Sequence, residues 1–220
     1  EFTPHRGFFA AFDVNTGREL WRFYTVPGDP SKFFENPALE KAAKTWSGEW
    51  WKYGGGASVW DSLSYDPEAN LIYVGTGNGA PWSQILRSPR LENLFVCSIL
   101  AVNPDNGSLA WHYQAVPGDS WDFDSVQQLL LADIQIDGRT RKVVMQANKG
   151  GFFYVLDRIT GEFISATPFT SVNWASGHDP KTGRPIVPAE AYYTTTTAVT
   201  ISPSAAGASN WAAKAYSPQT

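Results

Sequence analysis

The stretch AVNPDNGSLAW, residues 101–111, decides the fold of this chain. The same pattern occurs as AFDVNTGRELW at 11–21 and as VLDRITGEFIS at 155–165, where Ser165 stands in the place of the tryptophan. Each copy predicts a strand end, a tight turn and a second strand, because Asp or Asn bonds its own turn backbone and Gly adopts a positive φ. The chain is therefore expected to be built from repeats.

The spacing of the repeats indicates propeller blades. Gly17 and Gly107 are 90 residues apart, and Gly107 and Gly161 are 54 residues apart. A unit of about 45–55 residues with four short strands has the size of a blade. We therefore expect an all-β chain of about four blades, forming a single domain over residues 1–220. From its abrupt first and last residues we expect an internal piece of a longer chain, truncated at both ends.

Local sequence predicts the strands and one helix. Runs of β-branched and aromatic residues between turns predict strands at 71–75, 94–102, 141–147 and 151–156. The only helix is expected at 36–45, with Pro37 in its first turn. A weaker turn is expected at 65–70, and another, without flanking strands, at 178–183. The threonine run at 194–197 is expected to be a short polar strand or a loop.

Composition excludes several classes of protein. Of the 220 residues, 43% are hydrophobic and 15% aromatic, with 19 Gly and 15 Pro, which favours short strands over long helices. The net charge of −4 gives no reason to expect nucleic acid or an anionic membrane as partner. No apolar run reaches the roughly 18 residues of a membrane helix. The single cysteine, Cys97, allows neither a disulfide within the chain nor a cysteine-based metal site.

Two glycine-rich patches are candidate ligand sites. In GGGASVWD, residues 54–61, the glycines allow close approach of a ligand and Trp60 offers a flat apolar face. The alternative is a flexible turn beside a core tryptophan. In GTGNGAPW, residues 75–82, Asn78 can direct its amide oxygen at a hard cation. The alternative there is an ordinary Asn-Gly hairpin turn.

Charged residues mark two further patches. PGDSWDFD, residues 117–124, holds three carboxylates, and in an extended segment Asp122 and Asp124 would point to the same face. Like charges so placed repel each other unless a cation holds them or one is protonated, so a metal site or a general base would explain them. The alternative is a solvated acidic loop. Lys149, before two glycines, could bind a ligand oxygen, neutralise the aspartates or simply be solvated.

Taken together and in this order, these motifs resemble one family. The tryptophan-turn repeats, GGGxxxWD, GTGNG, PGDxWD and KGGFFYVLDR at 149–158 resemble the pyrroloquinoline-quinone (PQQ) dependent alcohol dehydrogenases. The quinoprotein and quinohaemoprotein alcohol dehydrogenases are the nearest branch, because Lys149 stands where methanol dehydrogenases carry Arg. The resemblance implies an eight-bladed propeller of which this chain holds about half, inactive alone. It also implies that Trp21 and Trp111 are buried between sheets, docked on the glycine of a neighbouring repeat.

The resemblance implies a set of PQQ contacts. Trp60 matches the floor beneath the quinone ring, and Ser58 stands where the family usually has a Thr bonded to a PQQ carboxylate. Lys149 matches the residue that contacts the quinone oxygens. Asn210 and Trp211 match a pair that contacts PQQ from a later blade, although a serine stands before them where the family usually has His.

The resemblance also implies a metal site and a base. Asn78 and Asp122 match a metal ligand and the catalytic base near the metal, and Glu1 matches a carboxylate ligand, with a spacing one residue too long. Calcium is the usual metal. However, Asp124 stands where lanthanide-dependent members carry an extra carboxylate ligand and calcium-dependent methanol dehydrogenases a small neutral residue. A trivalent ion requires more negative charge, so Ca²⁺ and a lanthanide both stay open, as does an Asp124 that faces solvent.

The implied activity is oxidation of a small alcohol to an aldehyde by hydride transfer to metal-bound PQQ. Electrons would pass to a cytochrome c, or to a haem c domain missing from the C-terminal side, and the compartment would be the periplasm. One alternative is a non-catalytic periplasmic propeller scaffold, which would need none of Trp60, Asn78, Asp122 and Lys149. The other is a PQQ sugar dehydrogenase, against which the Trp-Asp pair at 121–122 favours the alcohol branch.

Overall fold

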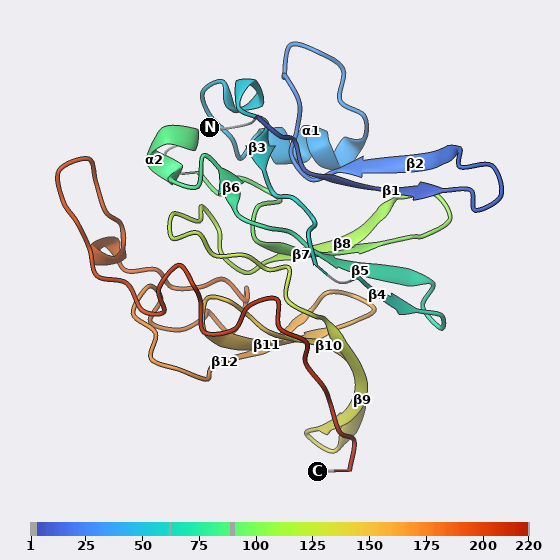
Figure 1. Cartoon of the computed structure of the whole chain (residues 1–220). Coiled ribbons are helices and arrows are strands. Elements are labelled where there is room, and N and C mark those ends of the chain that lie inside the picture. Colours follow the sequence, from blue (N-terminus) through green and yellow to red (C-terminus); the bar gives the residue numbers. More distant parts are fainter. Residues whose placement is uncertain (1–3, 62, 89–90, 220) are drawn as a thin grey trace.

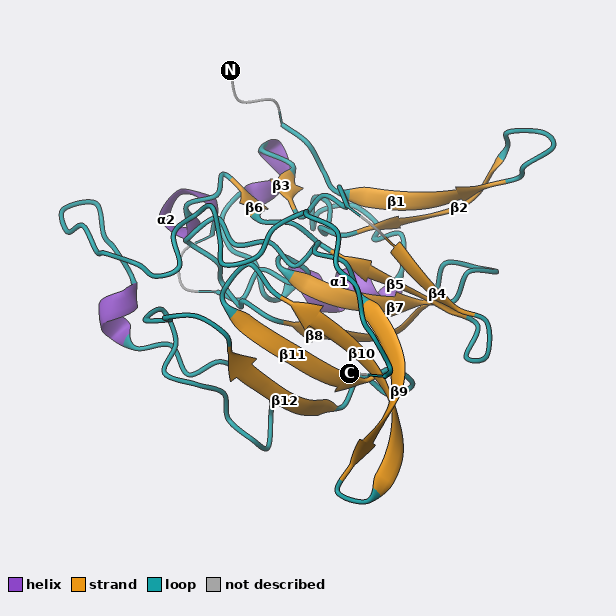
Figure 2. Ribbon diagram, turned by 60° about the horizontal axis from the view of Figure 1, so that its bottom comes forward, coloured by secondary structure: helices purple, strands orange, loops and turns teal. Residues whose placement is uncertain are grey.

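A computed structural model describes residues 4–61, 63–88 and 91–219. The described chain forms two four-stranded antiparallel sheets and two two-stranded ones. In Figure 1 the β1–β2 hairpin and the two larger sheets follow one another as successive layers, and Figure 2 shows the second large sheet more nearly face-on. This is the stacking of propeller blades.

Each large sheet is a meander of neighbouring strands. The first has the order β4-β5-β7-β8 and the second the order β12-β11-β10-β9. The strands are β1 (Phe8–Phe12), β2 (Glu19–Tyr24), β3 (Gly55–Gly56), β4 (Leu63–Asp66), β5 (Leu71–Gly75), β6 (Gly79–Ala80), β7 (Ser98–Val102), β8 (Leu109–Gln114), β9 (Leu130–Ile136), β10 (Arg139–Ala147), β11 (Phe152–Asp157) and β12 (Phe163–Pro168). The short pair β3–β6 lies apart from the two blades.

The repeated tryptophans dock on glycines of the next repeat, as the resemblance implied. A Cβ on Gly107 would lie 2.7 Å from the Trp21 ring, and one on Gly161 would lie 2.7 Å from the Trp111 ring. The Trp21 indole also donates to the Pro104 carbonyl at 2.8 Å. Trp111 is buried, whereas Trp21 is only partly buried, because its hairpin has just two strands.

The third repeat replaces the tryptophan by an earlier residue. Phe163, two positions before Ser165, lies against Gly183, where a Cβ would come within 2.6 Å of the phenylalanine. The Phe163 ring stacks on Tyr113, with centroids 5.9 Å apart, and the Tyr113 hydroxyl donates to the Gly183 carbonyl at 2.6 Å. The turn at 178–183 is therefore a docking turn for the second blade.

The structure confirms a partial propeller but corrects the number of blades. The described residues form two complete four-stranded blades and the β1–β2 hairpin, not about four blades. Residues 169–219 contain no strand and one turn of 3-10 helix, η2 (Ala189–Ala191). Within this described range, the Asp-Gly turn at 178–183 is flanked only by one isolated antiparallel bridge, between His178 and Pro185, and not by strands. The threonine run at 194–197 is a loop.

Two local predictions also change. Residues 94–97 form a turn rather than the start of a strand, and Cys97 has a positive φ of 47°, so β7 begins only at Ser98. The predicted helix is α1 (Pro37–Ala43), and the Asn36 side chain caps it by accepting from the Leu39 N–H at 3.0 Å. The short helices α2 (Gln84–Arg87) and η1 (Trp50–Lys52) were not predicted, because one turn shows no periodicity.

Aromatic side chains fill the core beside the loops that carry the candidate site. Trp174 is fully buried, and its ring lies 5.4 Å from Trp121, 5.6 Å from Phe123 and 5.8 Å from Phe152, centroid to centroid. These contacts hold the 117–124 segment against the second blade. Within the described ranges, no helix has the length and apolar character needed to cross a membrane.

Candidate active site

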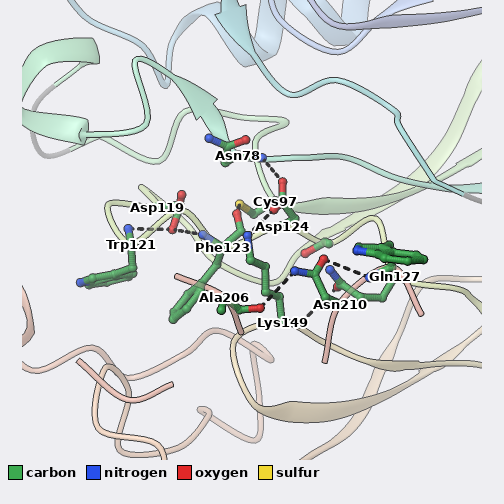
Figure 3. Close-up of polar contacts among 12 residues, drawn as sticks. Asn78, Cys97, Asp119, Trp121, Phe123, Asp124, Gln127, Lys149, Ala206 and Asn210 are labelled. Carbon is green, nitrogen blue, oxygen red and sulfur yellow. Dashed lines mark hydrogen bonds and ion pairs between the residues drawn. The ribbon is translucent and has the colours of Figure 1, made fainter. Parts of the chain in front are cut away.

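A buried ion pair lies at the centre of the candidate site. The Lys149 ammonium bonds the Asp124 carboxylate at 2.6 Å, and both side chains are about 95% buried. The other Asp124 oxygen accepts from the Asn78 backbone N–H at 2.8 Å and from the Trp60 indole at 3.4 Å. Figure 3 shows Asn78, Asp124 and Lys149 converging. The Asp124 carboxylate therefore brings together three other predicted residues, each from a separate loop: Asn78, Trp60 and Lys149.

Glycines in the 75–82 patch permit this convergence. A Cβ on Gly77 would lie 2.9 Å from an Asp124 oxygen and 3.0 Å from the Trp60 indole nitrogen. At Gly75, a Cβ would lie 2.0 Å from the Ser125 carbonyl oxygen. The glycines are thus required where the loop of Asp124 passes over the end of β5.

Asp122 and Asp124 do not form the extended pair that their spacing suggested. Asp122 has a φ of 63°, in the left-handed region, so the alternation of an extended strand does not apply. Asp124 is buried rather than solvated, and the Lys149 ammonium neutralises its charge. Burial raises the pKa of Asp122, and Asp124 raises it further, while the Lys149 charge opposes both.

The sequence did not single out Asp119 or Arg87. The Asp119 side chain is fully buried, and burial raises its pKa to about 7, opposed mainly by the Arg87 charge. Arg87, itself buried, donates to the Asp119 backbone carbonyl at 2.6 Å. The PGD triplet was the available signal for Asp119, whereas Arg87 lies in a segment without a motif.

Ser58 and Asn210 belong to segments that lie next to the Asp124–Lys149 ion pair or to its partners. Ser58 belongs to the Trp60 loop, and its carbonyl accepts from the Gly77 N–H at 2.9 Å. The segment before Asn210 covers Lys149, because a Cβ on Gly207 would lie 2.3 Å from the lysine stem. Asn210 itself donates to the Ala206 carbonyl, and Figure 3 shows both near Lys149.

Trp211 is not part of the cluster that the structure shows. Trp211 is 69% exposed, and its backbone N–H bonds the Asn210 side chain. Glu1 lies outside the described residues. Among the residues that are described, no group of three His, Cys, Asp or Glu side chains could hold a metal ion. The predicted ligands Asn78, Asp122 and Asp124 do not form such a group by themselves, because only two of them are carboxylates.

The side chains present fit a planar, acidic cofactor. Trp60 is 45% exposed and offers a flat face beside the Asp124–Lys149 pair. A buried ammonium complements acidic oxygens on a ring. The Asn78 amide nitrogen donates to the Gly79 carbonyl at 3.1 Å, which leaves the amide oxygen as the atom suited to a hard cation.

Comparison with known proteins identifies the family. A model of the glucose/ethanol/alcohol dehydrogenase β-propeller domain (PQQ) matches residues 1–180. The chain is 55% identical over 217 residues to the quinohemoprotein alcohol dehydrogenase ADH IIB of Pseudomonas putida, covering 98% of this chain and 31% of that protein. It is 51% identical to the quinohemoprotein alcohol dehydrogenase of Comamonas testosteroni over 218 residues, 98% of this chain and 30% of that protein.

Solved structures agree with these matches. The crystal structure of the Comamonas testosteroni enzyme superposes with a TM-score of 0.93 at 50% identity, over 97% of this chain and 32% of the other. A europium-containing methanol dehydrogenase gives a TM-score of 0.88 at 33% identity, over 99% and 39%. The chain spans about 30% of the length of its curated relatives, in keeping with two blades and a hairpin. This chain belongs to the PQQ-dependent alcohol dehydrogenase family and forms part of its β-propeller.

Proposed function

We propose that the protein containing this chain oxidises an alcohol to an aldehyde with PQQ as the electron acceptor. The buried Asp124–Lys149 pair against Trp60 and Asn78 carries this proposal. Burying an ion pair is costly, and this one lies beside the half-exposed Trp60 rather than at a turn between strands, where the buried Asp66–Arg158 pair lies. A ligand site explains that placement better than a non-catalytic scaffold does. The relatives named as alcohol dehydrogenases favour the alcohol branch over a sugar dehydrogenase.

In this proposal the protein positions the reactants and moves one proton. Bound PQQ supplies a two-electron acceptor. Asp122 takes the hydroxyl proton of the alcohol at its carboxylate, and its raised pKa brings it nearer to the working pH of a general base. Lys149 holds positive charge beside the cofactor oxygens, and Trp60 supports the ring by stacking. Ser58, Asn210 and Trp211 are proposed as further cofactor contacts.

Electron transfer to a cytochrome is the proposed next step. Several relatives are named quinohemoproteins, and one is named lupanine 17-hydroxylase [cytochrome c]. We propose a cytochrome c or a haem domain of the same protein as the acceptor, and the periplasm as the compartment.

The role of Asp122 can be tested directly. Asp122→Asn in the complete protein should keep PQQ bound and lose most turnover, because an amide cannot accept the alcohol proton. Turnover per bound PQQ measures this, with Asn103→Ala, a substitution in a docking turn of the first blade, as the control. A turnover close to that of the unmodified protein would show that Asp122 is not the base.

The proposed metal is a hard cation held by Asn78, Asp122 and an acidic residue such as Glu1, with Asp124 as a further candidate ligand. The europium-containing neighbour supports a lanthanide. The Asp124–Lys149 ion pair supports Ca²⁺, because Lys149 already balances the negative charge that Asp124 would offer a trivalent ion. Metal-free protein is reconstituted with PQQ and either Ca²⁺ or La³⁺. We expect activity with Ca²⁺; activity with La³⁺ alone would instead favour a lanthanide site with Asp124 as a ligand.

A further inference from the structure

The backbone around the proposed base is held in an unfavourable conformation. Asp122 is one of the few described non-glycine residues with a positive φ, at 63°. Such a conformation persists only where the surroundings determine it, and it occurs preferentially at functional sites. The question is therefore which contacts hold Asp122 in place.

The Asp119 carboxylate bonds the chain on both sides of Asp122. Its Oδ1 accepts from the Trp121 N–H at 3.1 Å and from the Phe123 N–H at 3.2 Å. Figure 3 shows Asp119 between these two residues, with both bonds drawn. One oxygen thus fixes the backbone N–H groups of the two residues that flank the proposed base.

We call the Asp119 carboxylate with its two bonds to the Trp121 and Phe123 N–H groups the Asp119 clamp. Other contacts anchor this clamp to the rest of the fold. Arg87 holds the Asp119 carbonyl, and the Cys97 thiol donates to the Phe123 carbonyl at 2.5 Å. The Trp121 indole donates to the Ala191 carbonyl at 3.0 Å. Hydrogen bonds to other segments therefore hold the loop at Asp119, Trp121 and Phe123. The Asp119 carboxylate links these positions to one another across Asp122.

The Asp119 clamp has a cost in free energy, the burial of a carboxylate, that forming a turn does not by itself require. Asp119 is fully buried, and its Oδ2 has no hydrogen-bond partner among the described residues. By contrast, Asp13 and Asp179 cap their turns with partly exposed carboxylates. Burying a carboxylate with one unpartnered oxygen is unfavourable. The cost is explained if the carboxylate sets the geometry of a functional residue.

We propose that Asp119 is a positioning residue that holds the Asp122 carboxylate in its productive orientation. Asp119 acts through the backbone of Asp122 and is not itself the base. The proposal rests on the proposed function, in which Asp122 accepts the alcohol proton. It assigns this task to the geometry of Oδ1 and not to the charge of Asp119.

The test is a double-mutant cycle in the complete, PQQ-loaded protein. Asp119→Ala removes the acceptor and should lower kcat per bound PQQ about 10- to 100-fold with little change in KM, because a small displacement of a reacting group costs that much. Asp119→Asn keeps an amide oxygen at Oδ1 and should retain most of kcat. In an Asp122→Asn background, Asp119→Ala should have no further effect, because the two residues act as one unit.

A matched control separates positioning from general destabilisation. Asp66 is also buried and also holds two backbone N–H groups, those of Glu68 and Ala69, but it lies at the turn between β4 and β5. Asp66→Ala should lower stability without lowering kcat per bound PQQ. If Asp119→Ala does not accumulate as folded protein, Asp119→Ser replaces it, because the shorter hydroxyl cannot span both N–H groups.

The outcomes distinguish the two proposals. If Asp122→Asn is inactive but Asp119→Ala has normal kcat, or if their effects simply add, Asp119 is not a positioning residue. If Asp119→Asn is as inactive as Asp119→Ala, charge rather than geometry matters, and the proposal is wrong. If Asp122→Asn keeps normal activity, the proposed function fails first, independently of the Asp119 variants.

Discussion

A single carboxylate organises the candidate site at the scale of residues. Asp124 bonds an ammonium, a backbone N–H and an indole N–H, which belong to three different loops. Removing one partner of a buried ion pair typically costs 3–5 kcal/mol, because the other charge stays uncompensated. Lys149 and Asp124 are therefore structural as well as functional, and their substitution would confuse the two effects. Trp60, which is half-exposed, is a cleaner residue to test.

Trp60→Ala should weaken PQQ binding. The substitution removes the flat face on which the cofactor ring is proposed to stack, and stacking on an aromatic side chain is worth about 1–3 kcal/mol. Titration of the cofactor-free complete protein with PQQ measures the change in Kd. Trp82, which is 51% exposed and also follows a glycine-rich patch, is the matched control and should tolerate alanine. Equal affinities of the unmodified and Trp60→Ala proteins would contradict the stacking role.

The docking turns connect the blades at the scale of elements. Trp111 of β8 reaches Gly161 in the turn between β11 and β12, and Phe163 of β12 reaches Gly183. The contact is so close that only a glycine fits, and its positive φ favours glycine for a second reason. Each blade thus carries both an aromatic side chain and the glycine that receives the aromatic side chain of its neighbour.

Gly161→Ala should destabilise the protein more than Gly138→Ala does. Both glycines have a positive φ, at 77° and 74°, so both substitutions carry a similar backbone strain of about 1–3 kcal/mol. Only Gly161 faces the Trp111 ring, whereas a Cβ on Gly138 would meet nothing within 4 Å. The difference between their unfolding midpoints in denaturant isolates the docking contact. Equal midpoints would show that docking contributes nothing to stability.

The second blade and the C-terminal segment meet around a histidine at the scale of the whole molecule. The His178 ring stacks on Phe163 and lies edge-on to Phe152, and its Nε2 is 3.1 Å from the Tyr154 hydroxyl. Burial lowers the pKa of His178 to about 4. The neutral imidazole therefore belongs to the packed interface, although His178 lies at the start of the turn predicted at 178–183.

The protein should lose stability as the pH falls from about 6.5 to 4 in a way that depends on His178. The unfolded chain binds a proton near the ordinary pKa of 6.5, whereas the folded chain resists protonation down to about 4. The contribution is therefore complete above pH 6.5 and decreases below it. Unfolding midpoints at pH 7 and pH 5 are compared between the unmodified protein and His178→Phe. An equal loss in both would exclude this histidine as a cause.

Much of the architecture and of the site could be predicted from local sequence. The strand-turn-strand repeats depend on hydrogen bonds within a few residues, so the docking tryptophans and glycines were visible in the pattern. Trp60, Asn78 and Lys149 stood out beside glycines, and Asp122 and Asp124 stood out as clustered carboxylates. Their roles at the site were implied only by the resemblance to the PQQ-dependent family. One docking partner, Gly183, was recognised as a turn but not as the site that receives Phe163.

What only the tertiary structure decided involves residues that are far apart along the chain. The Asp124–Lys149 bond joins positions 25 apart, and the contact of Trp60 with Asp124 joins positions 64 apart. Neither can be read from spacing, because both depend on how separate loops converge at the edge of the blades. The number of blades and the burial of Asp119 have the same origin. Strand pairing and desolvation are properties of the packed chain, whereas turn chemistry is a property of its sequence.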